Sequence, residues 1–454
     1  MIQASKGTPE ETFVWVVTKT GIRWLRSNLG TAALTSEVAA LRCGLDAATW
    51  DAPADRPGDN ATQLTENKAK RDRANACLAA LGSRPIDSLP FDQARAHRLF
   101  TSLFGEARDM IKGKHLLIVP SGPLTQLPFQ VLVTRLTPKS GDHKKVAWLA
   151  RDHAMTVLPS VSSLKALRRI ARPSTASRPM IGFGNPLLDG DSSQIRLAAL
   201  ARDYQHCRPP SREQVAAIGA ARSGLQPITL RSGLADLAHL KAQTPLPETA
   251  DELCAVARDL KADPDDVHLG ARATETEFKG LSASGRLAQY RIVHLATHGT
   301  LAGEISGARE PGLILTPPDI PTEIDDGYLS GSEIAALRLD ADWVILSACN
   351  TAGPASGGQS AGADRSGEAL SGLARVFFYS GARALLVSHW AVDSAAAVKL
   401  ITHAASLVAR DPAIGRAEAL RRSMLAMIDR GRAHEAHPAT WAPFVVVGEG
   451  GARR

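Results

Sequence analysis

Short, continuous runs of apolar residues, bounded by Gly and Pro, restrict the fold of this chain more than any other feature of its sequence. Such runs are typical of strands buried on both faces of a mostly parallel sheet. They lie at residues 116–119, 155–158, 180–183, 267–269, 292–296, 344–347, 384–387 and 444–447. Segments with helical periodicity lie between them, at 162–172, 250–261, 275–281, 367–379 and 395–408. This alternation predicts an α/β fold with helices layered on the sheet.

The N-terminal part has a different pattern. Aromatic and β-branched residues around a Lys-Thr-Gly turn predict a β-hairpin over residues 13–26. The spacing of apolar residues predicts helices over 35–45 and 92–112. The polar stretch 52–67 contains two prolines and is expected to be a loop. Residues 190–245 are polar and weakly periodic, which indicates a linker with local helices.

The chain has 454 residues, enough for two or three domains. We expect one continuous α/β unit in two lobes. The N-terminal lobe, residues 1–175, holds the hairpin, the long helix and the first strands, and the second lobe covers residues 176–454. No internal repeat of roughly 20 to 50 residues is visible, which argues against a solenoid.

Composition and charge narrow the class of protein. Hydrophobic residues make up 44% and charged residues 22%, which is ordinary for a globular protein and excludes a fibrous or wholly disordered one. No apolar run reaches the roughly 18 residues of a membrane span, and the first residues lack the order of a signal peptide. We therefore expect a cytoplasmic protein without a membrane partner. The net charge of +7 comes with arginines spread along the chain and only 5% aromatic residues, so nucleic acid is not expected as a direct partner.

The cysteines give no sign of cross-linking or metal binding. The sequence contains five of them, Cys43, Cys77, Cys207, Cys254 and Cys349, at wide and irregular intervals. An odd number without a CxxC pair predicts neither a disulfide framework nor a zinc site.

Two of the predicted strands run directly into a residue with reactive chemistry. His298 follows the strand at 292–296, and Cys349 follows the strand at 344–347. Ligands bind beyond the carboxyl ends of the strands in open parallel sheets, so neighbouring strands would bring both side chains to one edge. A thiol is mostly protonated at neutral pH, and a nearby imidazole can accept its proton and later protonate a leaving amine. The sequence therefore predicts a Cys-His pair for nucleophilic catalysis.

The residues around this pair support a catalytic role, although other roles exist. Gly299 lets backbone approach a substrate closely, and its N–H and that of Cys349 are expected to bind an oxyanion. A single cysteine or histidine at a strand end is more often a buried structural residue. His294 and His298 have the spacing of a zinc helix, but Leu295 replaces the glutamate of the zincin motif and the local pattern is that of a strand. We expect no metal.

Several ordered motifs resemble the CHAT domain family. They are HLLIVPSGPLTQLPF at 115–129, VLPS at 157–160, LPET at 246–249, VHLATHG at 293–299, LSACNT at 346–351, GLARVFFYSGAR at 372–383 and SHWAVD at 388–393. The resemblance covers most of the chain, from the hairpin near Phe13 to the apolar run at 441–448. This family consists of caspase-like cysteine peptidases of the clan that also holds separases and metacaspases.

The resemblance implies a caspase-like fold in the second lobe, His298 and Cys349 as the catalytic dyad, and no cofactor. Relatives are often fused to TPR repeats or other sensor modules, which implies an upstream sensor or activator protein besides the protein substrate. Ser347 stands two positions before Cys349, where several clan members have a residue of the specificity pocket, and it is uncharged. Asp393 resembles the aspartate with which separases bind a P1 arginine, although the surrounding motif differs. The alternative for Asp393 is to cap the helix that begins at residue 394.

The Gly/Ser/Ala-rich tract 353–367 follows the predicted nucleophile and is expected to be a loop beside the active site. A lid, an autocleavage site and a plain linker are all compatible with its composition. Arg365 is the single basic residue of the tract, and it is the expected cleavage position if an Arg-selective enzyme processes itself.

Motifs and resemblance together lead to a cysteine endopeptidase that cleaves a protein partner after a basic residue, arginine in particular. The resemblance further implies a bacterial defence or regulated cell-death pathway. The alternative is a catalytically silent CHAT-like scaffold that binds a partner. The presence of both His298 and Cys349 favours the enzyme, because a scaffold has no chemical need for either.

Overall fold

The computed structural model describes residues 10–55, 61–82, 89–136, 142–170, 174–191, 193–207, 237–300, 310–347, 373–411 and 413–452. Cys349, Arg365 and the whole tract 353–367 lie outside these residues.

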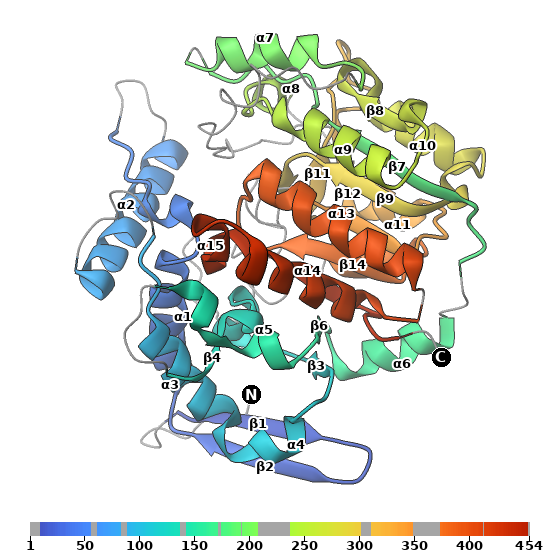
Figure 1. Cartoon of the computed structure of the whole chain (residues 1–454). Coiled ribbons are helices and arrows are strands. Elements are labelled where there is room, and N and C mark those ends of the chain that lie inside the picture. The colour runs from blue at the N-terminus through green and yellow to red at the C-terminus, as the bar shows by residue number, and fades with distance from the viewer. Residues whose placement is uncertain are drawn as a thin grey trace.

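An eight-stranded sheet forms the centre of the molecule (Figure 1). The strand order is β3-β6-β15-β14-β13-β9-β7-β8, and only the β14–β15 pair is antiparallel. The strands are β3 (Leu116–Ile118), β6 (Met155–Val157), β7 (Arg178–Gly184), β8 (Val267–Leu269), β9 (Tyr290–Ala296), β13 (Trp343–Leu346), β14 (Ala384–Ser388) and β15 (Phe444–Gly448). These are the eight strands that the apolar runs predict, which confirms the expected mostly parallel α/β fold.

Helices cover both faces of the sheet. Side chains alternate between the faces along a strand, so Val344 and Ile345 of β13 belong to two different apolar cores. Ile345 packs in the core that includes α9 (Glu248–Asp259), α13 (Ser394–Arg410) and α14 (Arg416–Arg430). Val344 packs in the core that includes α10 (Glu275–Ala283), α11 (Gly331–Ala336) and the helical residues 373–379. The result is a three-layer arrangement.

The N-terminal part packs beside this unit and begins with the predicted hairpin, β1 (Thr12–Val17) and β2 (Ile22–Ser27). The helix expected over 92–112 is interrupted, because α3 ends at Phe104 and a 3-10 turn precedes the next short helix. The other α-helices and strands in the described part of residues 10–170 are α1 (Thr31–Cys43), α2 (Ala61–Leu81), α3 (Gln93–Phe104), α4 (Arg108–Ile111), β4 (Val133–Arg135), β5 (Ala147–Trp148), α5 (Leu149–Asp152) and α6 (Val161–Ile170).

The expectation of a loop over 52–67 is wrong in its second half, since α2 begins at Ala61. This helix is polar nearly all round and therefore has no apolar stripe for a sequence pattern to reveal. Its buried contacts are few, and Cys77 packs with Cys43 and Trp50 in a small separate core.

The N-terminal stretch is joined to the rest through the central sheet itself, to which it contributes β3 and β6. Gln130 adds a side-chain link, because its buried Nε2 donates to the backbone oxygens of Ala442 and Phe444 at 3.2 and 2.9 Å. The division into lobes at residue 175 stays a prediction. The stretch 190–245 contains two local helices in its described part, α7 (Ile195–Asp203) and α8 (Leu237–Lys241).

The expectation that the cysteines form no disulfides is wrong. Cys43 pairs with Cys77, and Cys207 pairs with Cys254 on α9. The partners are 34 and 47 residues apart in the sequence, so only the folded chain brings them together. Of the five cysteines, Cys349 is the one outside these two bonds.

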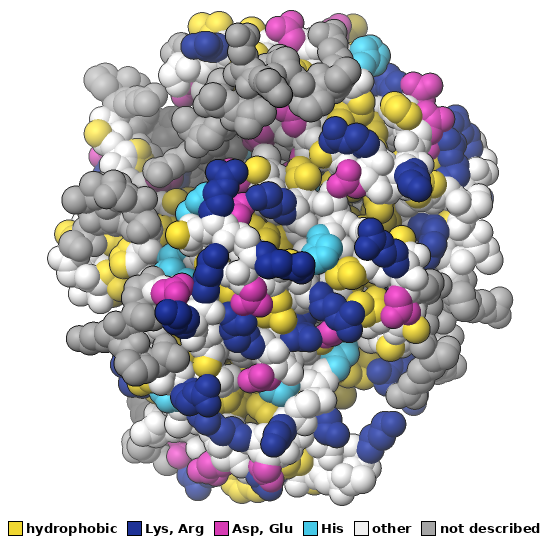
Figure 2. Space-filling view, in the orientation of Figure 1, with side chains coloured by type: hydrophobic (Ala, Val, Ile, Leu, Met, Phe, Trp, Pro, Cys, Tyr) yellow, Lys and Arg dark blue, Asp and Glu magenta, His cyan; other side chains and the backbone are white. Residues whose placement is uncertain are grey.

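The face of the molecule shown in Figure 2 carries Lys and Arg side chains that are scattered among acidic and hydrophobic ones. None of the helices in the described ranges combines the length and the apolar character needed to cross a membrane.

Candidate active site

The strands that precede the two predicted catalytic residues are neighbours. β9 and β13 are parallel, with Val293 opposite Val344 and Leu295 opposite Leu346. The pairing continues past β13, because Ser347 N donates to Leu295 O at 3.2 Å. The segments after β9 and β13 therefore leave the sheet at the same edge. The first leads to His298, and the second continues in the sequence to Cys349. Ser347 is the last described residue before Cys349.

His298 is fully buried, and its ring is held from one side. Nε2 lies 2.7 Å from Thr244 O. A carbonyl oxygen only accepts hydrogen bonds, so Nε2 carries the proton and Nδ1 is the basic nitrogen. Nδ1 has no hydrogen-bond partner within the described parts of the chain. Burial lowers the pKa of His298, and the bond to Thr244 acts in the opposite direction. The imidazole is thus neutral at neutral pH and able to accept a proton.

A small three-stranded sheet fixes the backbone on either side of His298. It consists of β10 (Gly299–Thr300), β11 (Gly312–Ile314) and β12 (Tyr328–Ser330). Ile314 N donates to His298 O at 2.9 Å, and the Thr297 hydroxyl donates to Ile314 O. Gly299, the predicted oxyanion residue, is buried and is the first residue of β10. These three strands were not among those predicted from the sequence.

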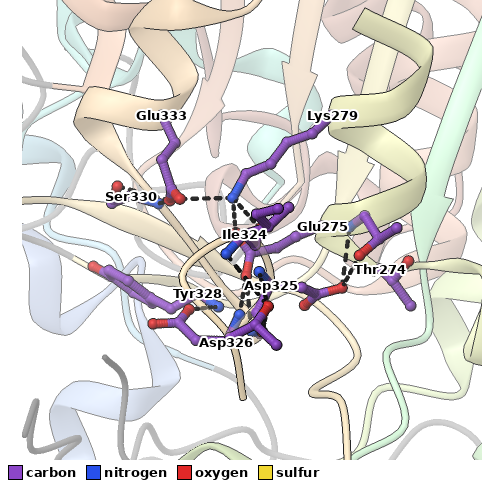
Figure 3. Close-up of polar contacts among 12 residues, drawn as sticks. Thr274, Glu275, Lys279, Ile324, Asp325, Asp326, Tyr328, Ser330 and Glu333 are labelled. Atoms are coloured by element: carbon purple, nitrogen blue, oxygen red, sulfur yellow. Dashed lines mark hydrogen bonds and ion pairs between the residues drawn. The ribbon is translucent and has the colours of Figure 1, made fainter. Parts of the chain in front are cut away.

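A partly buried ionic cluster around the buried Glu275 anchors this small sheet to α10 (Figure 3). Glu275 Oε2 accepts from the backbone N–H groups of Asp326 and Gly327 at 2.8 and 2.7 Å. Lys279 Nζ lies 2.8 Å from Glu275 Oε1 and 2.6 Å from Glu333 Oε1. Burial raises the pKa of Glu275 to about 7, while Lys279 opposes the rise. The cluster thereby holds the loop between β11 and β12. One part of it has a sequence signal, the capping box of Ser330 and Glu333.

Ser347 and His294 belong to the interior below the edge. His294 Nε2 lies 3.1 Å from Ser347 Oγ and 2.9 Å from Glu252 Oε1 on α9. His294 and His298 therefore have different partners. Among the described residues there is no group of three His, Cys, Asp or Glu side chains that could hold a metal ion.

Asp393 lies on the segment that follows β14, the other neighbour of β13 in the sheet. It is exposed and is the N-cap of α13, because its carboxylate accepts from Ala396 N at 3.0 Å. The observed role of the Asp393 carboxylate is thus to cap α13. Thr244 and Glu252 were not predicted as site residues. Both lie within three residues of the LPET motif at 246–249, which was the one signal in the sequence that could have pointed to them.

The described site thus consists of a buried imidazole at the carboxyl edge of an α/β sheet, beside a strand whose chain continues to a cysteine. The family model of the CHAT domain matches residues 93–449. The chain therefore belongs to the CHAT domain family, and this membership supports a caspase-like cysteine peptidase at the level of the family.

A comparison with solved structures finds similarity to a chain in the crystal structure of the Saccharomyces cerevisiae separase-securin complex. The sequence identity is 12% and the TM-score 0.37, and the match covers 87% of this chain and 20% of that chain. The chain thus spans about a fifth of the length of the chain it matches. Among curated proteins, none matches the sequence.

Proposed function

We propose that this chain is a cysteine endopeptidase in which Cys349 is the nucleophile and His298 the general base. The observation that carries the proposal is the state of His298: it is buried, its Nε2 is held by Thr244 O, and its Nδ1 has no partner in the described residues. The neighbouring strand continues to the one cysteine outside the two disulfides.

The proposed reaction needs only these groups, a peptide and water. His298 Nδ1 accepts the thiol proton, and the sulfur attacks the peptide carbonyl carbon. The N–H groups of Gly299 and Cys349 stabilise the oxyanion. Collapse of the intermediate breaks the C–N bond, and the imidazolium returns its proton to the leaving amine. Water, deprotonated by the same imidazole, then hydrolyses the thioester.

For specificity we propose cleavage after arginine in a protein substrate, with Asp393 and Ser347 as the substrate-binding residues. The support is the family resemblance of Asp393 and the proximity in sequence of Ser347 to Cys349. A single carboxylate favours the forked guanidinium over the point charge of lysine. A role in a bacterial defence or cell-death pathway, with an upstream sensor or activator protein, is the setting that the resemblance favours.

Hydrolysis of fluorogenic peptides with Arg, Lys or a neutral residue at P1 tests the proposal. Wild type should prefer Arg, and Cys349→Ala and His298→Ala should each lose turnover while circular dichroism stays unchanged. The scaffold alternative predicts the opposite result. In that case wild type, with both residues intact, hydrolyses none of these peptides and no peptide of a proteome-derived library.

Self-processing after Arg365 is a separate part of the proposal. A short tether holds Arg365 near the predicted nucleophile at an effective concentration on the order of millimolar, so autocleavage would be independent of dilution. Intact masses of wild type, Cys349→Ala and Arg365→Ala test it. Fragments split after Arg365 in wild type alone support self-processing, whereas an intact and active wild-type chain excludes it as a requirement.

A further inference from the structure

Beneath the edge that carries His298, a glutamate, a histidine and a serine make a line of polar contacts across three elements. Glu252 lies on α9, His294 on β9 and Ser347 directly after β13. Glu252 Oε1 lies 2.9 Å from His294 Nε2, and the same nitrogen is hydrogen-bonded to Ser347 Oγ at 3.1 Å. His294 is fully buried and Glu252 is 3% exposed, whereas Ser347 is half-buried. The line therefore runs from the interior toward the edge.

The contacts determine which atom carries the proton. A carboxylate has no proton to donate, and a bare nitrogen lone pair 2.9 Å from it would be repelled. His294 Nε2 therefore carries a proton, which it donates to Ser347 Oγ. The hydroxyl proton of Ser347 then points away from His294.

These polar groups occupy a layer that is otherwise apolar. Ile292 and Ala296, on the same side of β9 as His294, pack in the core under α9, as does Ile345 of β13. Burying a carboxylate there costs free energy that an apolar residue would not. Glu252 Oε1 and His294 Nδ1 also lack a hydrogen-bond partner in the described parts of the chain. Stability alone does not account for this arrangement. The Glu252 carboxylate, 2.9 Å away, favours the tautomer with the proton on His294 Nε2, and that nitrogen makes the directional bond to Ser347.

We propose that Glu252 is a positioning residue, which acts through His294 and Ser347 to hold the chain between β13 and Cys349 at a fixed distance from His298. α9 begins four residues after Thr244, whose carbonyl oxygen orients His298. One helix and the segment before it thus contact both His294, which is bonded to Ser347, and His298. The inference rests on the proposed function, because it assumes that His298 and Cys349 react together.

The test measures the alkylation of Cys349 by iodoacetamide against pH, together with kcat and KM for a P1-Arg peptide. Non-reducing conditions keep the other four cysteines in their disulfides. Glu252→Gln and Ser347→Ala should each raise the pH midpoint of alkylation and lower kcat by about tenfold or more, since small misplacements of reacting groups slow catalysis strongly. KM should stay unchanged in Glu252→Gln, which is remote from the substrate. The double variant should be no slower than the slower single variant. Glu418→Gln, which removes a half-buried carboxylate from α14, is the control and should change neither quantity.

The outcomes separate this inference from the proposed function. If His298→Ala leaves the alkylation midpoint unchanged, the proposed function fails and the inference falls with it. If His298→Ala raises the midpoint but Glu252→Gln and Ser347→Ala do not, only the inference is overturned. The inference is also overturned if the fold-losses in kcat of Glu252→Gln and Ser347→Ala multiply in the double variant. Ser347→Ala removes one oxygen at a half-buried position, so it tests the line of contacts even if Glu252→Gln unfolds.

Discussion

At the scale of single residues, Arg42 joins the N-terminal part to the segment behind β14. Its guanidinium lies 2.8 Å from Asp46 Oδ2 and donates to Gln126 O and His389 O at 3.0 and 3.2 Å. Arg42 is 5% exposed. A buried cation with three acceptors is costly to remove, because these acceptors lose their donor where little water reaches them.

Arg42→Ala should lower the free energy of unfolding by about 3 to 5 kcal/mol, since it leaves the carboxylate of Asp46 buried without its partner. The measurement is urea denaturation followed by circular dichroism. Arg26→Ala, which breaks the exposed pair with Glu11, is the control and should cost about 1 kcal/mol or less. Equal losses in the two variants would show that the buried contacts of Arg42 contribute nothing special.

Asp393 allows capping and substrate binding to be separated. Asparagine caps a helix about as well as aspartate does but has no charge. Asp393→Asn should therefore keep the melting temperature and lower kcat/KM for a P1-Arg peptide by an amount equivalent to about 1 kcal/mol, a small effect because the carboxylate is exposed. Asp393→Ala should lose about 1 kcal/mol of stability in addition. An unchanged Arg preference in Asp393→Asn assigns the residue to capping alone.

At the scale of elements, α2 depends on its disulfide more than on its packing. Its buried residues are few, and Cys77 is among them. The Cys43–Cys77 bond closes 34 residues of chain, and the loss of chain entropy in the unfolded state stabilises the fold by about 3 to 4 kcal/mol.

Cys77→Ser should therefore lower the melting temperature and open α2 to proteases. Limited trypsin digestion of the variant and of wild type, with cleavage sites read by mass spectrometry, checks this. Early cuts at lysines and arginines of α2 are expected in Cys77→Ser and not in oxidised wild type. Equal digestion rates would mean that packing, and not the disulfide, holds the helix.

The central sheet could be predicted from the sequence because most of its strands, such as β13, β14 and β15, are buried on both faces and are therefore mainly apolar. The carboxyl-edge location of His298 followed from the same pattern, since β9 ends two residues before it. The strands β10 to β12 were missed, because each contains Gly, Thr or Ser in place of a continuous apolar run. α2 and the disulfides were missed for a related reason: their stability comes from residues far apart in the sequence, such as Cys207 and Cys254.

The buried polar line below the site was equally hidden. Glu252 stands on a helix whose sequence reads as an ordinary amphipathic one, and the LPET motif marked only its beginning. His294 appeared as a candidate metal ligand because of its distance from His298 along the chain. Only the packing of α9 on β9 shows that its partners are Glu252 and Ser347.

At the scale of the whole molecule, buried titratable groups set how stability depends on pH. Burial lowers the pKa of His389 to about 3 and those of His268 and His437 to about 4. Below the usual histidine pKa the unfolded chain binds protons that the folded chain does not, so stability falls as pH falls from about 6.5 to 4. Burial raises the pKa of Glu248 and Glu275 to about 7. These two glutamates have the opposite effect: the stability that they contribute in the protonated form is lost as pH rises from about 4.5 to 7.

The two sets together predict a melting temperature that is highest near about pH 6.5 and falls toward pH 5, because the histidines outnumber the two glutamates. Calorimetric scans between pH 4.5 and 8 measure it. His389→Asn should reduce the slope on the acid side, since it removes one of the groups that the unfolded chain protonates. A melting temperature that keeps rising down to pH 5 would contradict this balance of charges.

The most direct test of the account is the reaction of the whole protein with a peptidyl acyloxymethyl ketone that carries arginine at P1. Peptide mapping by mass spectrometry identifies the modified residue, and the time course gives its rate. We predict one adduct per chain, on Cys349, formed at least about tenfold more slowly in His298→Ala because the thiol then lacks its base. Wild type without an adduct on Cys349, or an equal rate in His298→Ala, would contradict a Cys349–His298 dyad.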